Sequence, residues 1–345
     1  MGNQPITILG GGLAGLTLGI GLRQRGVPVT IWEAGRYPRH KVCGEFISGR
    51  GQDVLRRLGL LSSLIAAGAS KASSALFILE KHCGPLRSVH PPALCLSRFA
   101  MDALLAQRFT ERGGELKPEQ RWRGPLPEGT VRATGRRAQP PQNGWIWFGL
   151  KIHARNVPLA ADLELHGLAN GYVGLCRLPA GETNICGLFR RRASSGTRRQ
   201  NWQALLRGPP ESILHRRLAS AEFDPGSFCS VAGLAFQPQQ ASGLSECCIG
   251  DALTMIPPVT GNGMSMALEA AELAIAPLAG YSSGAWSWQQ ARAAIAQACD
   301  ARFAQRLTWA SRLQKLMFVP GIFTVFGSIA LRSERLWRAL FTRTR

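Results

Sequence analysis

Apolar residues near the start of the chain fall into short runs and one helical pattern. Residues 5–9 and 28–32 form short apolar runs typical of buried strands, and residues 13–25 carry apolar positions at helical spacing. A glycine follows the helical stretch and can end the helix. Strand, helix and strand in this order predict a βαβ unit with two parallel strands.

A similar pattern returns near residue 250. A short apolar run ends at the acidic residue Asp251, a turn rich in Pro and Gly follows, and a long Ala-rich and Leu-rich helix runs to Leu278. Gly261 and Gly263 lack a Cβ, so the backbone can approach a flat ligand closely. The free N–H groups at the start of the helix favour an anionic atom. The stretch therefore predicts a ligand-facing helix start, and the alternative is an ordinary loop before a core helix.

Between these two ends the pattern changes from helices to strands. Residues 72–90 contain two short apolar runs, which predict a pair of strands. Residues 145–188 contain four more runs, separated by Gly, Pro and Asn, which predict an antiparallel sheet. Helical spacing predicts helices over residues 53–64 and 98–112, and a further helix that ends near residue 217.

The first strand and the first helix are joined by a glycine-rich turn. The turn reads Gly10-Gly11-Gly12-Leu13-Ala14-Gly15, a G-x-G-x-x-G pattern. In such a turn the first glycine makes the bend, the second lets a pyrophosphate reach the backbone N–H groups, and the third lets helix and strand pack closely. Glu33 ends the second strand, where an acid accepts hydrogen bonds from ribose hydroxyls. We therefore predict that this unit binds a dinucleotide.

The order of elements predicts an α/β fold. A Rossmann-like dinucleotide-binding domain is interleaved with an antiparallel-sheet substrate domain, and a helical C-terminal tail follows. The expected division is residues 1–70, 91–138 and 223–282 for the first domain, 71–90 and 139–222 for the second, and 283–345 for the tail.

Five motifs give the chain a resemblance to a known superfamily. They are GGGLAG, PRHKVCGEF at residues 38–46, LSRFAMDALL at 96–105, VRATGRR at 131–137 and GDALTMIPPVTGNGMSMA at 250–267. Together they resemble the FAD-dependent oxidoreductases that include geranylgeranyl reductases, flavin-dependent halogenases and aromatic-ring monooxygenases of the p-hydroxybenzoate hydroxylase type. The match is closest to the geranylgeranyl-reductase-like branch and covers most of the first 280 residues. It implies noncovalent FAD with its ring between the Rossmann-like domain and the substrate sheet.

The resemblance also implies which residues contact FAD. Arg36 or Lys41 would meet the pyrophosphate, and Gly261 to Met264 would lie against the pyrimidine edge of the flavin. Cys43 would lie beside the ring, where its thiol could gate or protonate substrate, and the alternative is a small packing residue. The full set of expected cofactor contacts is Gly10, Gly12, Leu13, Ala14, Gly15, Glu33, Ala34, Arg36, Lys41, Cys43, Gly44, Arg98, Gly135, Asp251, Gly261, Asn262, Gly263 and Met264.

Three features of the sequence narrow the range of reactions that the resemblance allows. Thr134 precedes Gly135 where aromatic hydroxylases carry an Asp-Gly pair, which weakens their mode of NAD(P)H contact. Trp145 and Trp147 form half of the halogenase W-x-W-x-I-P pattern, but the rest is missing, so halogenation is disfavoured. His153 and His166 fall on predicted strands and are expected to be structural rather than catalytic.

Charge and cysteine content limit which partners and which cellular compartment are expected. The formal net charge is +20 at pH 7, supplied mostly by arginine, and favours anionic lipid or a phosphate-bearing carrier. No nucleic-acid motif is present, so nucleic acid is not expected. The 9 cysteines include no C-x-x-C pair and no metal-ligand spacing, which indicates a reducing, cytoplasmic compartment and no metal site. The N-terminus lacks the pattern of a signal peptide.

Residues 316–331 contain no charged side chain and are bounded by basic residues. The stretch is shorter than the ~20 residues that span a bilayer. In residues 331–341, which follow, apolar side chains alternate with arginines at helical spacing. This pattern favours peripheral binding to an anionic membrane surface, and the alternative is that the apolar segment is a buried helix that closes the substrate cavity.

We therefore predict an FAD-dependent oxidoreductase that acts on an apolar or carrier-bound substrate. NAD(P)H or an external reductase would supply electrons, because no second nucleotide-binding unit is visible. Hydroxylation by a monooxygenase is favoured slightly over reduction of carbon–carbon double bonds. Halogenation and non-enzymatic flavin binding are the less favoured alternatives.

Overall fold

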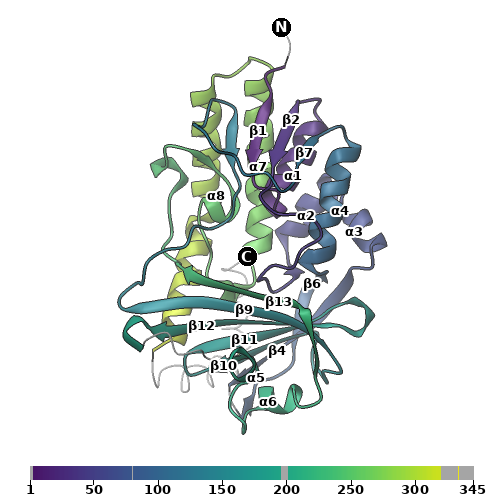
Figure 1. Cartoon of the computed structure of the whole chain (residues 1–345), viewed down its shortest axis with the longest axis vertical. Helices are drawn as coiled ribbons and strands as arrows, with labels where there is room; N and C mark the ends of the chain where they lie inside the picture. The colour runs from purple at the N-terminus through teal and green to yellow at the C-terminus, as the bar shows by residue number, and fades with distance from the viewer. Residues whose placement is uncertain (1–2, 80, 196–200, 320–332, 334–345) are drawn as a thin grey trace.

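The computed structural model describes residues 3–79, 81–195, 201–319 and 333. A five-stranded parallel sheet forms the upper part of the molecule (Figure 1). Its strand order is β14-β8-β1-β2-β7, with β1 Ile6–Leu9, β2 Val29–Trp32, β7 Glu115–Lys117, β8 Thr130–Arg132 and β14 Cys247–Cys248. The predicted βαβ opening is present, and the α/β fold is confirmed.

Helices cover this parallel sheet, because packing there buries the apolar side chains of both the helices and the sheet. Helix α1 (Leu13–Arg23) is buried over nearly its whole length and packs against α7 (Gly263–Ser282) and α4 (Arg98–Glu111). Helix α8 (Trp288–Met317) packs on α7, where Arg306 Nη1 donates to Glu269 Oε1 at 2.7 Å. The two remaining helices of this part are α2 (Arg50–Arg57) and α3 (Leu61–Ala66). They replace the single helix predicted over 53–64, because the chain turns at Gly59 with φ +67°.

A nine-stranded sheet lies below (Figure 1). Its order is β13-β9-β12-β11-β10-β4-β6-β3, with β5 paired to β4. The strands are β3 Phe46–Ile47, β4 Ser70–Leu79, β5 His82–Cys83, β6 Arg87–Cys95, β9 Trp145–Arg155, β10 Leu163–Leu168, β11 Gly171–Arg177, β12 Thr183–Arg192 and β13 Glu222–Leu234.

Two expectations for this sheet need correction. Strands β10 and β4 are parallel, so the sheet is mixed rather than wholly antiparallel. Strand β13 pairs with β9, so residues 222–234 belong to this sheet, although the sequence indicated that residues 223–282 belong to the dinucleotide-binding domain.

The two faces of the nine-stranded sheet have different roles. Two short helices, α5 (Trp202–Arg207) and α6 (Ile213–Arg217), cover one face and close an apolar core with Leu150, Ile152 and Val173. They stand where one helix was predicted, because Gly208 and two prolines interrupt it. The opposite face is turned toward the parallel sheet and is left to line a cavity.

Helix α8 extends from the upper part down to the nine-stranded sheet (Figure 1). It starts with a capping box in which Ser287 and Gln290 satisfy each other's backbone N–H groups. The predicted membrane-binding stretch at 316–331 lies outside the described residues from position 320 onward. None of the helices in the described part of the chain is long and apolar enough to cross a membrane.

Candidate functional site

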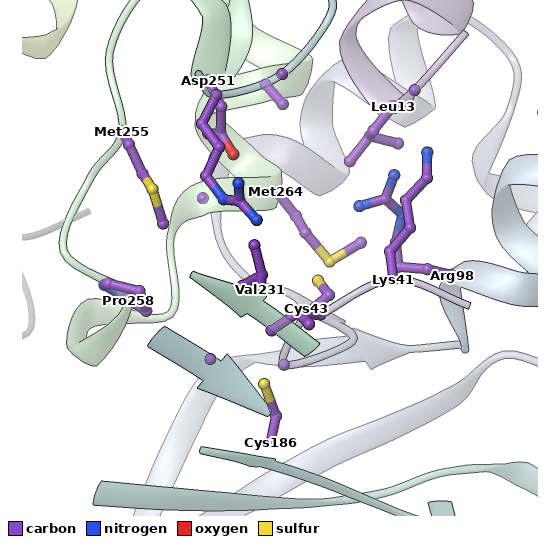
Figure 2. Close-up of a pocket in the computed structure, with 18 of the residues that line it drawn as sticks. Leu13, Lys41, Cys43, Arg98, Cys186, Val231, Asp251, Met255, Pro258 and Met264 are labelled. Carbon is purple, nitrogen blue, oxygen red and sulfur yellow. The ribbon is translucent and has the colours of Figure 1, made fainter. Parts of the chain in front are cut away.

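A cavity of about 1500 Å³ lies between the two sheets. Pockets for one small ligand usually measure ~300–1,000 Å³, so this cavity has room for a cofactor and a second molecule. Figure 2 shows Lys41 and Arg98 on one side and Met255 and Pro258 on the other, with Cys43 and Met264 between them. Both sheets and the loops between them contribute to the lining.

The glycines of the turn have two different roles: some allow close packing, and one leaves space for a ligand. A Cβ on Gly10, where φ is +107°, would overlap the Ala133 carbonyl, and one on Gly15 would overlap the carbonyl of Gly10. A Cβ on Gly12 would meet only Lys41 Nζ, at 3.6 Å. Gly12 therefore keeps open a space that the folded chain leaves to a ligand, beside the free N–H groups that begin α1.

Glu33 fixes the shape of this turn. Its Oε2 accepts a hydrogen bond from Gly11 N at 2.8 Å, and its Oε1 accepts from Gly35 N at 2.7 Å and from Arg39 Nη2 at 2.8 Å. The residue is 4% exposed and lines the cavity at the end of β2. It therefore holds the turn and the next loop together, and its position suits a ribose acceptor.

Two cations share one buried carboxylate on the cavity wall. Arg98 Nε and Nη2 donate to the two oxygens of Asp102 at 2.7 Å each, and Lys41 Nζ donates to Asp102 Oδ2 at 2.7 Å. Burial alone would raise the pKa of Asp102, but the charges and hydrogen bonds of Arg98 and Lys41 outweigh it and hold that pKa below its usual value. The group carries a net charge of +1, which suits an anionic pyrophosphate.

The sequence pointed to Lys41 and Arg98 but missed Asp102. The available signal was the spacing of four residues between Arg98 and Asp102 within one predicted helix, which places the two side chains on the same face.

A second polar cluster joins the loop after β2 to strand β9. Glu45, which has φ +61°, accepts from Arg98 N at 2.9 Å, and its Oε2 lies 2.6 Å from His153 Nε2. Lys151 is fully buried, with Nζ 2.9 Å from His40 Nδ1 and 3.6 Å from Glu45 Oε1. The cluster therefore positions the loop that carries Lys41 and Cys43. His153 is buried and hydrogen-bonded in this cluster, and its structural rather than catalytic role stays a prediction. Lys151 and His40 were not singled out from the sequence.

His40 should give the protein an acid-sensitive stability. Burial, followed by the charges of Lys151 and His153, lowers its pKa from 6.5 to about 4, although Glu45 and Asp224 oppose the shift. Between these two values the unfolded chain binds a proton that the folded chain does not, so the free energy of unfolding should fall as pH drops from 6.5 to about 4. Urea unfolding across this range measures it. His40→Gln should remove part of the slope, and an unchanged slope would contradict the assignment.

Cys43 lies in the loop that this cluster holds. Asn184 Nδ2 donates to the Cys43 carbonyl at 2.9 Å, which ties the loop to β12. Burial raises the pKa of the Cys43 thiol, and Arg98 only partly offsets the effect. The thiol is therefore held protonated, which suits a proton donor better than a nucleophile.

The opposite wall comes from the segment around Asp251 and α7. Burial raises the pKa of Asp251, against the opposing charges of Arg98 and Arg136. Gly261 has φ +64°, and a Cβ there would overlap the Phe46 ring. Gly263 begins α7, and a Cβ there would meet only Ile256, at 3.9 Å. This helix start therefore faces the cavity without obstruction.

Most of the predicted cofactor residues line this one cavity. They are Gly10, Gly12, Leu13, Ala14, Glu33, Ala34, Lys41, Cys43, Gly44, Arg98, Gly135, Asp251, Gly261, Gly263 and Met264. The structure does not place three others on the lining. Arg36 is exposed on the surface, and Arg39 lines the cavity in its place. Gly15 packs against Gly10, and Asn262 is buried and accepts a hydrogen bond from Ser48 Oγ at 3.3 Å.

No metal site accompanies this cavity in the described ranges. Across residues 3–79, 81–195, 201–319 and 333, no group of three or more His, Cys, Asp and Glu side chains is placed to hold a metal ion.

Comparison with known proteins agrees with this geometry. Residues 3–138 match the family model described as FAD binding domain. Comparison with curated protein sequences gives no match. The turn at Gly12 and the cationic group at Lys41 and Arg98 both lie within the matched residues.

Solved structures share the fold over nearly the whole chain. The flavin-dependent brominase Bmp2 has a TM-score of 0.74 at 19% identity, over 97% of this chain and 92% of that one. The flavin-dependent halogenase CmlS has a TM-score of 0.73 at 18% identity, over 98% and 67%. P. aeruginosa PqsL in complex with 2-aminobenzoylacetate has a TM-score of 0.64 at 16% identity, over 93% and 99%. At these identities the likeness shows the fold.

The match over residues 3–138 shows an FAD binding domain, and the solved structures share the fold. Both findings are consistent with the resemblance to FAD-dependent oxidoreductases drawn from the motifs. The assignment of the chain to the geranylgeranyl-reductase-like branch stays a prediction.

Proposed function

We propose that the chain is an FAD-dependent monooxygenase that hydroxylates an apolar substrate, with electrons from NAD(P)H or a separate reductase. The observation that carries the proposal is the continuity of the cavity. One space runs from the open turn at Gly12 to the apolar side chains of the nine-stranded sheet, such as Leu165, Leu188 and Val231. A cofactor at the turn and a substrate over the sheet would therefore lie in the same enclosure.

The residues present fit FAD. The open space at Gly12 and the net positive charge of Lys41, Arg98 and Asp102 suit its pyrophosphate, and Glu33 suits its ribose. When bound, FAD supplies electron transfer and the activation of oxygen. The residues of the chain position the loop beside the cavity and exclude water. The Glu45 cluster fixes the loop beside the cavity, and the apolar face of the sheet excludes water from the reacting centre.

Reduction of a carbon–carbon double bond is the second candidate, and Cys43 favours it. Such a reduction adds a hydride, which reduced FAD would supply, and a proton, and burial keeps the Cys43 thiol protonated at the cavity wall. The proton would pass from Sγ to the substrate carbon, leaving a thiolate that Arg98 can stabilise because its charge lowers the thiol pKa.

Labelled oxygen separates the two reactions. With ¹⁸O₂, an apolar substrate and NADPH, the proposed monooxygenase should place one labelled atom in the product and should consume oxygen faster when substrate is present. Mass spectrometry of the product and an oxygen electrode measure both. A product heavier by two hydrogens, formed without oxygen by dithionite-reduced enzyme, would instead establish the reductase. If no combination of electron donor and acceptor gives turnover, the protein would be a non-enzymatic flavin-binding protein.

A further inference from the structure

The last turn of α8 and the two residues after it have two different sides. This end of the helix reaches the nine-stranded sheet (Figure 1), where Phe318 is buried. Leu313 and Met317, four residues apart, line the cavity. Leu316 and Val319 are not part of the cavity lining, and they are 38% and 40% exposed. One short segment therefore separates the cavity from the surroundings of the protein.

Leu316 and Val319 form a pair of exposed apolar side chains. Val319 N donates to the Leu316 carbonyl at 3.3 Å, so the two residues share one turn. The pair opens the uncharged stretch 316–331, so the sequence continues with further apolar residues. Single exposed apolar residues are normal on protein surfaces. The other large ones in the described ranges lie in separate segments and are Ile65, Leu86, Phe99 and Trp286.

Basic side chains accompany this apolar pair. Arg312 and Lys315 are exposed, and the Arg312 guanidinium lies over the Trp309 ring, 5.5 Å from its centroid. The sequence contains no Asp or Glu between Asp300 and Glu334. The outer side of the helix end is therefore positively charged as well as apolar. We call it the α8 end face, formed by Trp309, Arg312, Lys315, Leu316 and Val319.

Two arginines of β12 extend the positive charge beside this face. Arg190 Nη2 donates to the Phe318 carbonyl at 2.9 Å, which ties the strand to the helix end. The guanidiniums of Arg190 and Arg192 lie 4.3 Å and 4.1 Å from the centroid of the Trp145 ring. Burial and then the charge of Arg192 lower the pKa of Arg190, as expected where no acid lies close. Arginine and tryptophan both favour the boundary between water and lipid, because each has an apolar body and a polar end.

Charge decides between a lipid surface and a second copy of this chain as the partner. A symmetric dimer through the α8 end face would bring Arg312 and Lys315 of the two copies together, and like charges repel. An anionic bilayer offers phosphates to these bases and hydrocarbon to the apolar pair. The net charge of +20 attracts the whole protein to the same surface. The observations therefore favour an anionic bilayer.

We propose that the α8 end face binds the protein to the surface of an anionic lipid bilayer. Its apolar side chains reach below the lipid head groups, and its basic side chains contact the phosphates. Leu313 and Met317 then form a cavity wall that borders lipid, which suits the entry of an apolar substrate. The proposal goes beyond the reaction proposed above, and lipid binding is measured without turnover.

Vesicle flotation of the full-length, FAD-loaded protein tests the proposal. One set of vesicles contains phosphatidylglycerol and phosphatidylcholine in equal parts, and the other contains phosphatidylcholine alone. The protein should float with the first set and stay behind with the second. Added salt should weaken the binding, because it screens the charges of the bases and the phosphates.

Two double variants locate the contact. Arg312→Ala with Lys315→Ala should weaken binding about fivefold for each base removed. Leu316→Ser with Val319→Ser should weaken it at least about tenfold, because two apolar side chains no longer enter the lipid. Thermal unfolding and FAD content of each variant check that the fold is intact. The matched controls change side chains that are exposed elsewhere and should bind as the wild type does; they are Arg56→Ala with Lys81→Ala, and Ile65→Ser with Leu86→Ser.

Four outcomes of flotation would overturn the proposal. They are no binding to the anionic vesicles, equal binding to phosphatidylcholine alone, wild-type binding by either double variant, and an equal loss in the matched controls. A wild-type dimer that Leu316→Ser with Val319→Ser dissociates, seen by light scattering, would assign the face to a second copy instead. If the labelled-oxygen experiment fails while flotation behaves as expected, the proposed reaction is wrong and the lipid-binding face stands.

Discussion

Replacing Gly12 with valine is expected to give a folded but colourless protein. A Cβ at this position meets only Lys41 Nζ, at 3.6 Å, so the folded chain has room for it. The same Cβ fills the space through which a pyrophosphate would reach the N–H groups that begin α1. Losing two hydrogen bonds to charged oxygens, at about 1.5–3 kcal/mol each, would weaken FAD binding roughly a hundredfold or more.

Valine variants at two further glycines serve as controls for this result. Gly15→Val should prevent folding, because its side chain would overlap the carbonyl of Gly10 and crowd Ile8. Gly243→Val should bind FAD normally, because no atom lies near that Cβ. Flavin absorbance after gel filtration and thermal unfolding of the FAD-free proteins provide the measurements. A yellow Gly12→Val protein at wild-type flavin content would reject the assignment of the turn.

Asp102→Asn is expected to destabilise the protein by about 3–5 kcal/mol, the range found when one partner of a buried charge pair is removed. Asp102 has a fully buried side chain, and it pairs with both Arg98, whose side chain is 12% exposed, and Lys41, whose side chain is 22% exposed. The amide would leave the two cations without the carboxylate that they share. Urea unfolding measures the loss.

Asp53→Asn is the control for Asp102→Asn. Asp53 pairs with Arg56 on the surface, where both side chains are about half exposed or more, at 49% and 62%. Such a pair contributes at most ~1 kcal/mol. The deficit of Asp102→Asn should also shrink in the presence of saturating FAD, because an anionic pyrophosphate can replace part of the lost charge. Equal losses for the two variants would show that the buried group is not a charged cluster.

The sequence was most informative where structure depends on neighbours in the chain. The βαβ opening, the glycine turn and the helix after Asp251 all follow from local spacing, and the structure has them where they were predicted. Strand β13 was missed for the same reason. Its Asp224-Pro225-Gly226 segment has the composition of a turn, yet the strand continues past it after a shift in register between Asp224 and Cys229.

The polar contacts of the candidate site could not be predicted from local patterns in the sequence. Glu45 and His153 are 108 residues apart in the sequence, and His40 and Lys151 are 111 apart. Residue spacing carries no information about such pairs, because they meet only through the packing of β9 under the loop after β2. The strand residues that line the cavity, such as Leu165 and Leu188, could not be identified for a similar reason, since a strand pattern does not tell which face borders a cavity.

The order of strands in the parallel sheet also has a consequence for how the chain acquires its structure during synthesis. Strand β8 lies between β1, from the first ten residues, and β14, which is made only at residues 247–248. Helix α7, which covers α1, is complete only at Ser282. A nascent chain that has emerged up to the end of the first 138 residues still lacks one strand and the helix that buries its apolar surface. The strands of the sheet below are all made by Leu234, the end of β13, before β14 emerges. The FAD binding domain therefore cannot mature ahead of the sheet below it.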